Sequence, residues 1–333
     1  MVGALYRWQF PVMKSRVLIT LPLPTTVLEA LKQQFELQVW DEGPMPTAQI
    51  AQWAKTTDAI LCSLGTPISA DLIGSNPQLS TISSISVGVD HIDMAAATAA
   101  RLPVGHTPDV LVDSTADLAL ALMLAATRRV VEADRFVRGG HWSADWATDF
   151  FLGTDLSRAT VGIVGLGPTG LAVVKRVRAF GADVIGWNRT EREVLGVRNV
   201  ALDDLFAEAD IVSVHTAAAP ETHHIVSADR LALMKPGAVI INTARGSVID
   251  ESALIKTLSE GKIRAGLDVY EQEPVAKDSP LLAMDNVVLM PHLGSATAAT
   301  RQAMMERALT NLVAGLSGKP LPWCANPEVY TGP

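Results

Sequence analysis

The sequence predicts an α/β protein made of two doubly wound, Rossmann-like domains with a cleft between them. Short apolar runs alternate with helical patterns along most of the chain, which favours parallel strands joined by helices. This alternation occurs twice, once before residue 108 and once after it, and 333 residues exceed the usual size of one domain. In such folds ligands bind at the carboxyl ends of the strands, so we expect functional residues there.

The first domain is expected to begin after an extension over residues 1–15, in which Met13 is an alternative start. Its strands are short apolar runs, expected at 16–20, 37–40, 58–62 and 82–87. Helices are expected at 25–35, at 47–53 and from 69 to about 73. Pro108 disfavours helix in the residue before it and closes this half of the chain.

The second half begins with an almost wholly apolar helix at 113–129, for which Ser114 or Thr115 is the expected cap. A helix that is apolar all round belongs in a protein interior or at an interface. A looped arm with Trp142 and Trp146 follows it. Further strands are expected at 161–164, 183–187, 211–215, 239–243, 265–269 and 287–290, and a last helix at about 297–316.

A glycine-rich turn at 165–170 follows the strand at 161–164 and leads into a helical pattern. Gly165 allows the tight turn, Gly167 lets the backbone approach a pyrophosphate, and Gly170 lets the helix pack close to the strand. The helix N-terminus then offers free N–H groups to the phosphates. Because strand, turn, helix and second strand occur in this order, we predict a dinucleotide site.

The end of the second strand predicts which cofactor binds. An Asp or Glu at this place binds the ribose hydroxyls of NAD, but here the residues are Asn188, Arg189 and Thr190. Asp183 lies at the opposite end of the strand, whereas Arg189 can meet a 2′-phosphate with its planar, charged fork. Arg192 is expected to share this role if the following turn folds back. We therefore expect NADPH to be preferred, with NADH possible.

Composition excludes several classes of function. The net charge of −8 disfavours nucleic acid and anionic membranes as partners. Cys62 and Cys324 are far apart in sequence, without metal-ligand spacing, which indicates a reducing compartment and no metal site. The N-terminus does not read as a signal peptide, and no apolar run reaches the ~20 residues of a membrane span. A cytoplasmic protein is expected, and the lack of a GxSxG motif disfavours a hydrolase.

Six blocks at or near the expected strand ends carry a family resemblance: 85–93, 106–111, 114–117, 242–246 with Asp250, 266–274 and 291–296. In this order they resemble the D-isomer-specific 2-hydroxyacid dehydrogenases, most of all the glyoxylate/hydroxypyruvate reductase and 2-ketogluconate reductase branch. The resemblance implies Arg245, Glu273 and His292 as catalytic residues. Each alone is more often structural, but the joint match at three strand ends favours catalysis. A His beside a carboxylate can protonate a developing alkoxide, and a cation can hold the oxo acid.

The resemblance also implies the binding residues. The expected substrate contacts are Leu64, Val87, Gly88 and Val89 together with Arg245 and His292. The expected cofactor contacts lie at the glycine turn and at the ends of neighbouring strands. They are Gly165, Leu166, Gly167, Pro168, Thr169, Gly170, Asn188, Arg189, Thr190, His215, Thr216, Pro220, Thr222, Thr243, Ala244, Asp268, Gly294 and Thr115.

Domain bounds and assembly also follow from the resemblance. It implies a discontinuous substrate domain, 1–107 plus 294–333, and a dinucleotide-binding domain at 108–293. It also implies a homodimer built around the apolar helix and the arm, in which Trp146 reaches the partner's active site.

The expected activity is NADPH-dependent reduction of small 2-oxo acids, such as glyoxylate, hydroxypyruvate or 2-ketogluconate, to D-2-hydroxy acids. Two alternatives are a dehydrogenase for another acid, such as phosphoglycerate or formate, and a non-catalytic NAD(P)-binding sensor or repressor. The three residues expected to be catalytic argue against the sensor.

Overall fold

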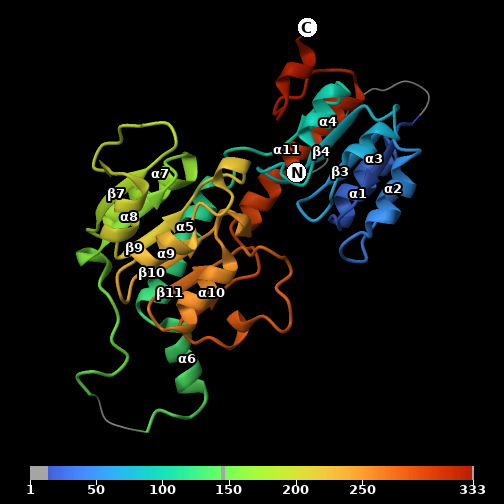
Figure 1. Cartoon of the computed structure of the whole chain (residues 1–333). Helices are drawn as coiled ribbons and strands as arrows, with labels where there is room; N and C mark the ends of the chain where they lie inside the picture. The colour runs from blue at the N-terminus through green and yellow to red at the C-terminus, as the bar shows by residue number, and fades with distance from the viewer. Residues whose placement is uncertain (1–13, 144–146, 332–333) are drawn as a thin grey trace. The chain divides into compact units, whose positions relative to one another are not determined.

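The computed structural model describes residues 14–143 and 147–331. The chain forms two compact units, one made of Met1–Val110 with Ala298–Pro333 and the other of Leu111–Thr297. Each unit contains one parallel sheet flanked by helices, five strands in the first and seven in the second (Figure 1). The predicted fold class, with two Rossmann-like α/β domains, is confirmed.

Unit 1 holds the sheet β2-β1-β3-β4-β5. Its strands are β1 (Arg16–Ile19), β2 (Glu36–Val39), β3 (Ala59–Cys62), β4 (Thr81–Ser84) and β5 (Val104–Gly105). Its helices are α1 (Thr25–Lys32), α2 (Thr47–Ala54), α3 (Ala70–Gly74), α4 (Met94–Ala99) and α11 (Ala298–Leu316), and a 3₁₀ turn covers Pro327–Tyr330.

Alternating side chains bury both faces of this sheet. Leu18 and Ile60 belong to one apolar cluster, whereas Val17 and Ile19 pack on the other face in a cluster that contains Leu312 of α11. The C-terminal helix thus completes the core of the N-terminal segment, which is why this unit is discontinuous in sequence. The sequence did not predict α4 and β5, because one is a short alanine-rich helix and the other has two residues.

Unit 2 holds the sheet β12-β11-β10-β9-β6-β7-β8. Its strands are β6 (Thr160–Val164), β7 (Asp183–Trp187), β8 (Arg198–Asn199), β9 (Ile211–Val214), β10 (Val239–Asn242), β11 (Arg264–Leu267) and β12 (Val287–Leu289). Its helices are α5 (Val112–Thr127), α6 (Val130–Arg138), α7 (Pro168–Ala179), α8 (Leu202–Glu208), α9 (Ala228–Leu233) and α10 (Glu251–Ser259). Short 3₁₀ turns cover Leu156–Arg158, Pro220–Thr222, Gly246–Val248 and Pro280–Ala283.

The apolar helix α5 is a core element of unit 2. Leu122 and Met123 are buried in a cluster that also contains Val161 and Ile163 of β6. The helix begins at Val112, with Leu111 in the cap position and no side-chain cap bond. Ser114 and Thr115 therefore lie inside the first turn, and the prediction that one of them caps the helix is wrong.

A second helix, α6, follows between the helix predicted at 113–129 and the looped arm, where the sequence analysis predicted no element. Arg129 between the two helices has φ of 54°, a left-handed conformation that breaks the first helix. α6 has no buried residue and projects away from the sheet of unit 2 (Figure 1). Trp142 beyond it is 67% exposed, while Trp146 lies outside the described residues. None of the helices described in either unit is long and apolar enough to cross a membrane.

Candidate active site

Three neighbouring strand ends in unit 2 bring Arg245, Glu273 and His292 to one edge of the sheet. They follow β10, β11 and β12, which are adjacent in the sheet and parallel. Because parallel strands end at the same edge of the sheet, these three residues lie near one another although they are far apart in sequence.

His292 and Glu273 form a hydrogen-bonded pair. The distance from His292 Nδ1 to Glu273 Oε2 is 2.7 Å, and Tyr270 N donates to Glu273 Oε1 at 3.1 Å. Burial by itself would raise the pKa of Glu273, but the hydrogen bond and charge of His292, the Tyr270 N–H and the charge of Arg245 lower it overall. An ionised carboxylate only accepts, so Nδ1 of His292 carries a proton. Nε2 is left as the nitrogen that can exchange a proton with a ligand.

Asp268 holds the turn that presents His292. Its carboxylate accepts from Leu293 N at 2.6 Å and from Gly294 N at 2.8 Å, and its carbonyl accepts from His292 N at 2.9 Å. Thr115 on α5 donates to Gly294 O at 3.1 Å. His292 itself has φ of 56°, a conformation that such a network can maintain. Burial raises the pKa of Asp268, although the two backbone N–H groups and His292 act against this rise. Asp268, Thr115 and Gly294 thus form one polar network behind His292.

The turn with Arg245 is braced by Asn242, whose role the sequence analysis missed. Asn242 Oδ1 accepts from Ala244 N at 3.0 Å, and its Nδ2 donates to Arg245 O at 2.8 Å. A Cβ at Gly246 would lie 1.8 Å from the backbone carbon of Tyr270, so only glycine lets these two turns meet. An Asn that ends a buried strand two residues before a turn is the signal that could have revealed this brace.

The glycine turn after β6 leaves the start of α7 open. Gly165 has φ of 100°, and a Cβ at Gly170 would lie 2.0 Å from Gly165 O, whereas one at Gly167 would meet nothing within 4 Å. Pro168 is the first residue of α7, and no side chain caps the helix. Strand order changes direction at β6, since β7 lies on one side of it and β9 on the other. This is where dinucleotides bind in such sheets.

Residues beyond β7 surround this turn. Asn188 Oδ1 accepts from Leu166 N at 3.0 Å and its Nδ2 donates to Thr190 O at 2.7 Å, while Arg192 Nη1 donates to Leu166 O at 2.9 Å. The side chain of Arg192 therefore supports the glycine turn by bonding a backbone carbonyl of that turn. Arg189 is an exposed cation, 3.7 Å from the carboxylate of Glu221, a neighbour that the sequence analysis did not consider.

The next two strand ends carry buried polar atoms without a hydrogen-bond partner among the described residues. They are His215 Nδ1, Thr216 Oγ1 and Thr243 Oγ1, after β9 and β10. Burial lowers the pKa of His215 to about 4, and its Nε2 lies 2.8 Å from Ser213 Oγ. Unpaired buried polar groups are costly, and a bound dinucleotide would supply partners for them. The site therefore fits such a cofactor, although Thr222 uses its hydroxyl inside the loop, bonding Ala217 O at 2.6 Å.

The expected substrate contacts of unit 1 lie in two loops. Leu64 follows β3, and Val87, Gly88 and Val89 follow β4. All four are half-buried. Ala244 and Pro220 lie in the loops of unit 2 after β10 and β9, and Thr169 lies in the first turn of α7.

A second His–Glu pair lies in unit 2. His224 Nε2 is 2.5 Å from Glu271 Oε1, and His224 has φ of 50°. Glu271 N donates to Glu251 Oε2 at 3.0 Å, so the loop after β11 is tied down twice. The sequence analysis missed this pair, whose members are 47 positions apart.

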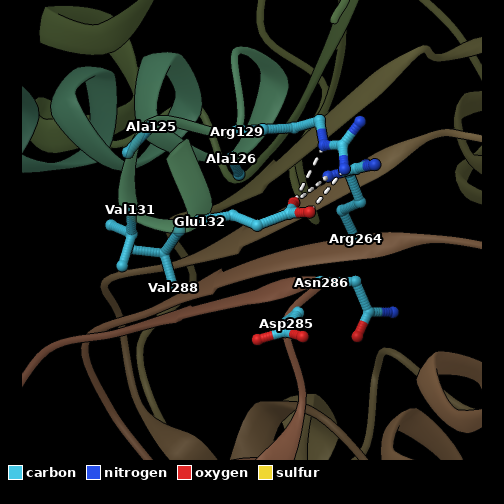
Figure 2. A pocket seen from close by; sticks show the side chains of 9 residues that line it. All are labelled: Ala125, Ala126, Arg129, Val131, Glu132, Arg264, Asp285, Asn286 and Val288. Atoms are coloured by element: carbon cyan, nitrogen blue, oxygen red, sulfur yellow. Dashed lines mark hydrogen bonds and ion pairs between the residues drawn. The ribbon is translucent and has the colours of Figure 1, made fainter. Parts of the chain in front are cut away.

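A small hollow lies at the opposite, amino-terminal end of β11 and β12 (Figure 2). The carboxylate of Glu132 stands between the guanidinium groups of Arg129 and Arg264 there, 2.8 Å from Arg129 Nε and 3.8 Å from Arg264 Nη1. Burial and the charge of Arg129 lower the pKa of Arg264. This cluster ties the start of α6 to β11, so its role is structural.

Comparison with known proteins shows that this chain is similar to 2-hydroxyacid dehydrogenases and glyoxylate reductases. Residues 120–294 match the family described as D-isomer specific 2-hydroxyacid dehydrogenase, NAD binding domain. A glyoxylate reductase of Korarchaeum cryptofilum is 43% identical over 323 residues, which cover 95% of this chain and 97% of that protein.

Solved structures show the same similarity. A protein of Thermus thermophilus superimposes with a TM-score of 0.87 and 41% identity, covering 93% of this chain and 99% of the other. An NADPH-dependent glyoxylate/hydroxypyruvate reductase of Sinorhizobium meliloti, solved with NADP and malonate, gives a TM-score of 0.84 and 32% identity over 95% of this chain and 98% of the other.

Proposed function

The chain belongs to the D-isomer specific 2-hydroxyacid dehydrogenase family, and on this premise we propose that it is an NADPH-dependent reductase of small 2-oxo acids. Glyoxylate is the first expected substrate, and hydroxypyruvate and 2-ketogluconate are further ones. The observation that carries the proposal is the group of Arg245, Glu273 and His292 at three adjacent strand ends, with Nδ1 of His292 bonded to Glu273.

In this proposal His292 is the general acid. A bound nicotinamide cofactor supplies the hydride to C2 of the oxo acid. His292 donates the Nε2 proton to the ketone oxygen as negative charge develops there. Glu273 holds Nδ1 and favours the imidazolium form, so that a proton stays available. Arg245 binds the oxo acid through its guanidinium, and the backbone N–H groups of the 87–89 loop receive the carboxylate.

The NADPH preference rests on the end of β7. Gly167 and the uncapped start of α7 suit a pyrophosphate, and Arg189 suits the 2′-phosphate next to it. Glu221, 3.7 Å from Arg189, is an acid that would weaken the phosphate site by competing for this cation. NADH is thus a usable but weaker cofactor.

We further propose that unit 1 binds the substrate, that unit 2 binds the dinucleotide, and that two chains form a homodimer through the α5–α6 region of unit 2. Apolar side chains are exposed on α6 and beyond it, namely Val130, Val137, Trp142, Phe150 and Leu152. A large isologous contact would cover them. Free cysteines at positions 62 and 324 are in keeping with a reducing, cytoplasmic location.

The test is a panel of 2-oxo acids offered with NADPH or NADH, in which cofactor oxidation is followed by absorbance. Turnover of glyoxylate with NADPH, and a D product from hydroxypyruvate, are expected. Cofactor binding without turnover of any acid in the panel would instead identify a non-catalytic NAD(P)-binding sensor.

A further inference from the structure

Buried polar groups lie directly beneath the 87–89 loop in unit 1. Ser84 and Ser86 are 0% and 2% exposed, and their hydroxyls are 2.6 Å apart. Ser86 Oγ donates to Gly88 O at 2.7 Å, and Ser84 Oγ lies 3.1 Å from His91 Nε2. A continuous chain of polar atoms therefore connects His91 to a carbonyl of the loop.

The hydrogen bonds between these polar groups can run in only one direction, from His91 to Gly88 O. Gly88 O can only accept, so Ser86 uses its single proton there. Ser86 must then accept from Ser84, and Ser84 must accept from His91, which assigns a proton to His91 Nε2. Burial raises the pKa of the neighbouring Cys62 thiol to about 12, so no thiolate charge enters the chain.

This row of hydrogen bonds fixes the orientation of the peptide group between Gly88 and Val89. In a trans peptide the C=O and N–H point in opposite directions, so holding Gly88 O inward turns the N–H of Val89 away from the buried serines. The preceding peptide is held in the same way, because His106 Nδ1 lies 3.0 Å from Val87 O and the N–H of Gly88 points away from it. Within the described chain neither of these two N–H groups has a hydrogen-bond acceptor.

We infer that Ser86, supported by Ser84 and His91, is a positioning residue that presents the N–H groups of the 87–89 loop to the substrate carboxylate. This inference rests on the proposed function, because it assumes a carboxylate ligand. N–H groups oriented before binding stabilise an anion without a reorganisation cost, so the buried hydroxyls should control affinity for the acid rather than the hydride step.

Strand β4 provides a matched control in Ser83. Ser83 is also 0% exposed and its hydroxyl also donates to a backbone carbonyl, Ala308 O at 2.7 Å, but it does not belong to the loop network. Ser83→Ala and Ser86→Ala each remove one buried hydroxyl-to-carbonyl bond, and Ser86→Ala also removes the bond with Ser84. A thermal melt of each variant measures its loss of stability separately from its oxalate affinity.

The experiment measures the binding of oxalate, a non-reducible dicarboxylate, to the NADPH-loaded full chain by calorimetry. Ser86→Ala should weaken oxalate about tenfold, the effect of one hydrogen bond to a charged group, and Ser84→Ala somewhat less. Ser83→Ala should stay within about twofold of the wild type, a difference of ~0.4 kcal/mol. With glyoxylate, KM should rise in the same order while kcat is kept.

Wild-type oxalate affinity in Ser86→Ala, an equal loss in Ser83→Ala, or no oxalate binding by the wild type would overturn the inference. If Ser86→Ala does not fold, Ser84→Ala compared with Ser83→Ala decides by the same criterion. A wild type that binds oxalate but reduces no 2-oxo acid would refute the proposed function, while the order of the variants would still test the inference.

Discussion

Two His–Glu pairs in unit 2 look alike but differ in their surroundings. His292–Glu273 and His224–Glu271 are 2.7 Å and 2.5 Å apart, both histidines have positive φ, and the two glutamates are two residues apart on one loop. All four side chains are about one-third exposed. The geometry of the contact alone therefore does not identify a proton donor.

The two pairs differ in the other groups that surround them. Glu273 also accepts from Tyr270 N, and the charge of Arg245 contributes to its lowered pKa. His292 is carried by a turn that Asp268 holds at three points. The backbone N–H of His224 donates to Ser247 O at 3.0 Å. We therefore expect the His292–Glu273 pair, beside the charge of Arg245, to act as the acid, and the His224–Glu271 pair to fasten its loop.

The largest effect should come from His292→Ala. Turnover of the 2-oxo acid should fall by about 10²- to 10⁴-fold, because the proton donor is lost. NADPH affinity, measured by fluorescence titration, should stay unchanged, because the glycine turn after β6 is untouched. Near wild-type turnover would show that another group supplies the proton.

A smaller effect, restricted to the cofactor, should come from Arg189→Ala, which touches neither pair. Losing a charge-assisted contact of ~1.5–3 kcal/mol should raise KM for NADPH about ten- to a hundredfold and barely change KM for NADH. Equal losses for both cofactors would mean that Arg189 supports the fold.

Glu221→Gln is the counterpart of that variant. It removes the carboxylate 3.7 Å from Arg189, so NADPH should bind a few-fold more tightly, with NADH unchanged. Weaker NADPH binding in this variant would show that Glu221 orients Arg189 rather than competing for it.

The smallest effect should come from His224→Ala. Its pair is partly exposed, so its loss should cost about 0.2–1 kcal/mol in the free energy of unfolding. Turnover should stay within about threefold of the wild type. A loss as large as that of His292→Ala would break the distinction between the two pairs.

The sequence predicted the features of the fold that depend on local residue patterns. Alternation located the strands, and the glycine spacing located the turn before α7. Arg245, Glu273 and His292 were predicted to follow strands that the structure places side by side, while their catalytic roles stay a prediction.

Contacts between distant residues could not be predicted in this way. Glu221 beside Arg189 and His224 beside Glu271 depend on how loops fold back, and periodicity does not report this. Helix α6 was missed because its start depends on the left-handed conformation of Arg129, a residue that usually continues a helix. The hydroxyls of Ser84 and Ser86 looked like ordinary strand residues until Gly88 was placed beside them.

The pH dependence of kcat/KM in Glu273→Gln tests the central claim most directly. In the wild type the rate should fall as pH rises, because a general acid works only while it holds its proton. The pKa of Glu273 is lowered, so its carboxylate and the pair should persist below the ordinary Glu pKa of ~4.3 and be lost only as pH falls further. Without this carboxylate the protonated form of the acid loses its charged partner, and the falling limb should move to lower pH. Glu271→Gln should leave that limb in place. An unmoved limb in Glu273→Gln, or an equal shift in Glu271→Gln, would contradict the assignment of His292–Glu273 as the proton-donating pair.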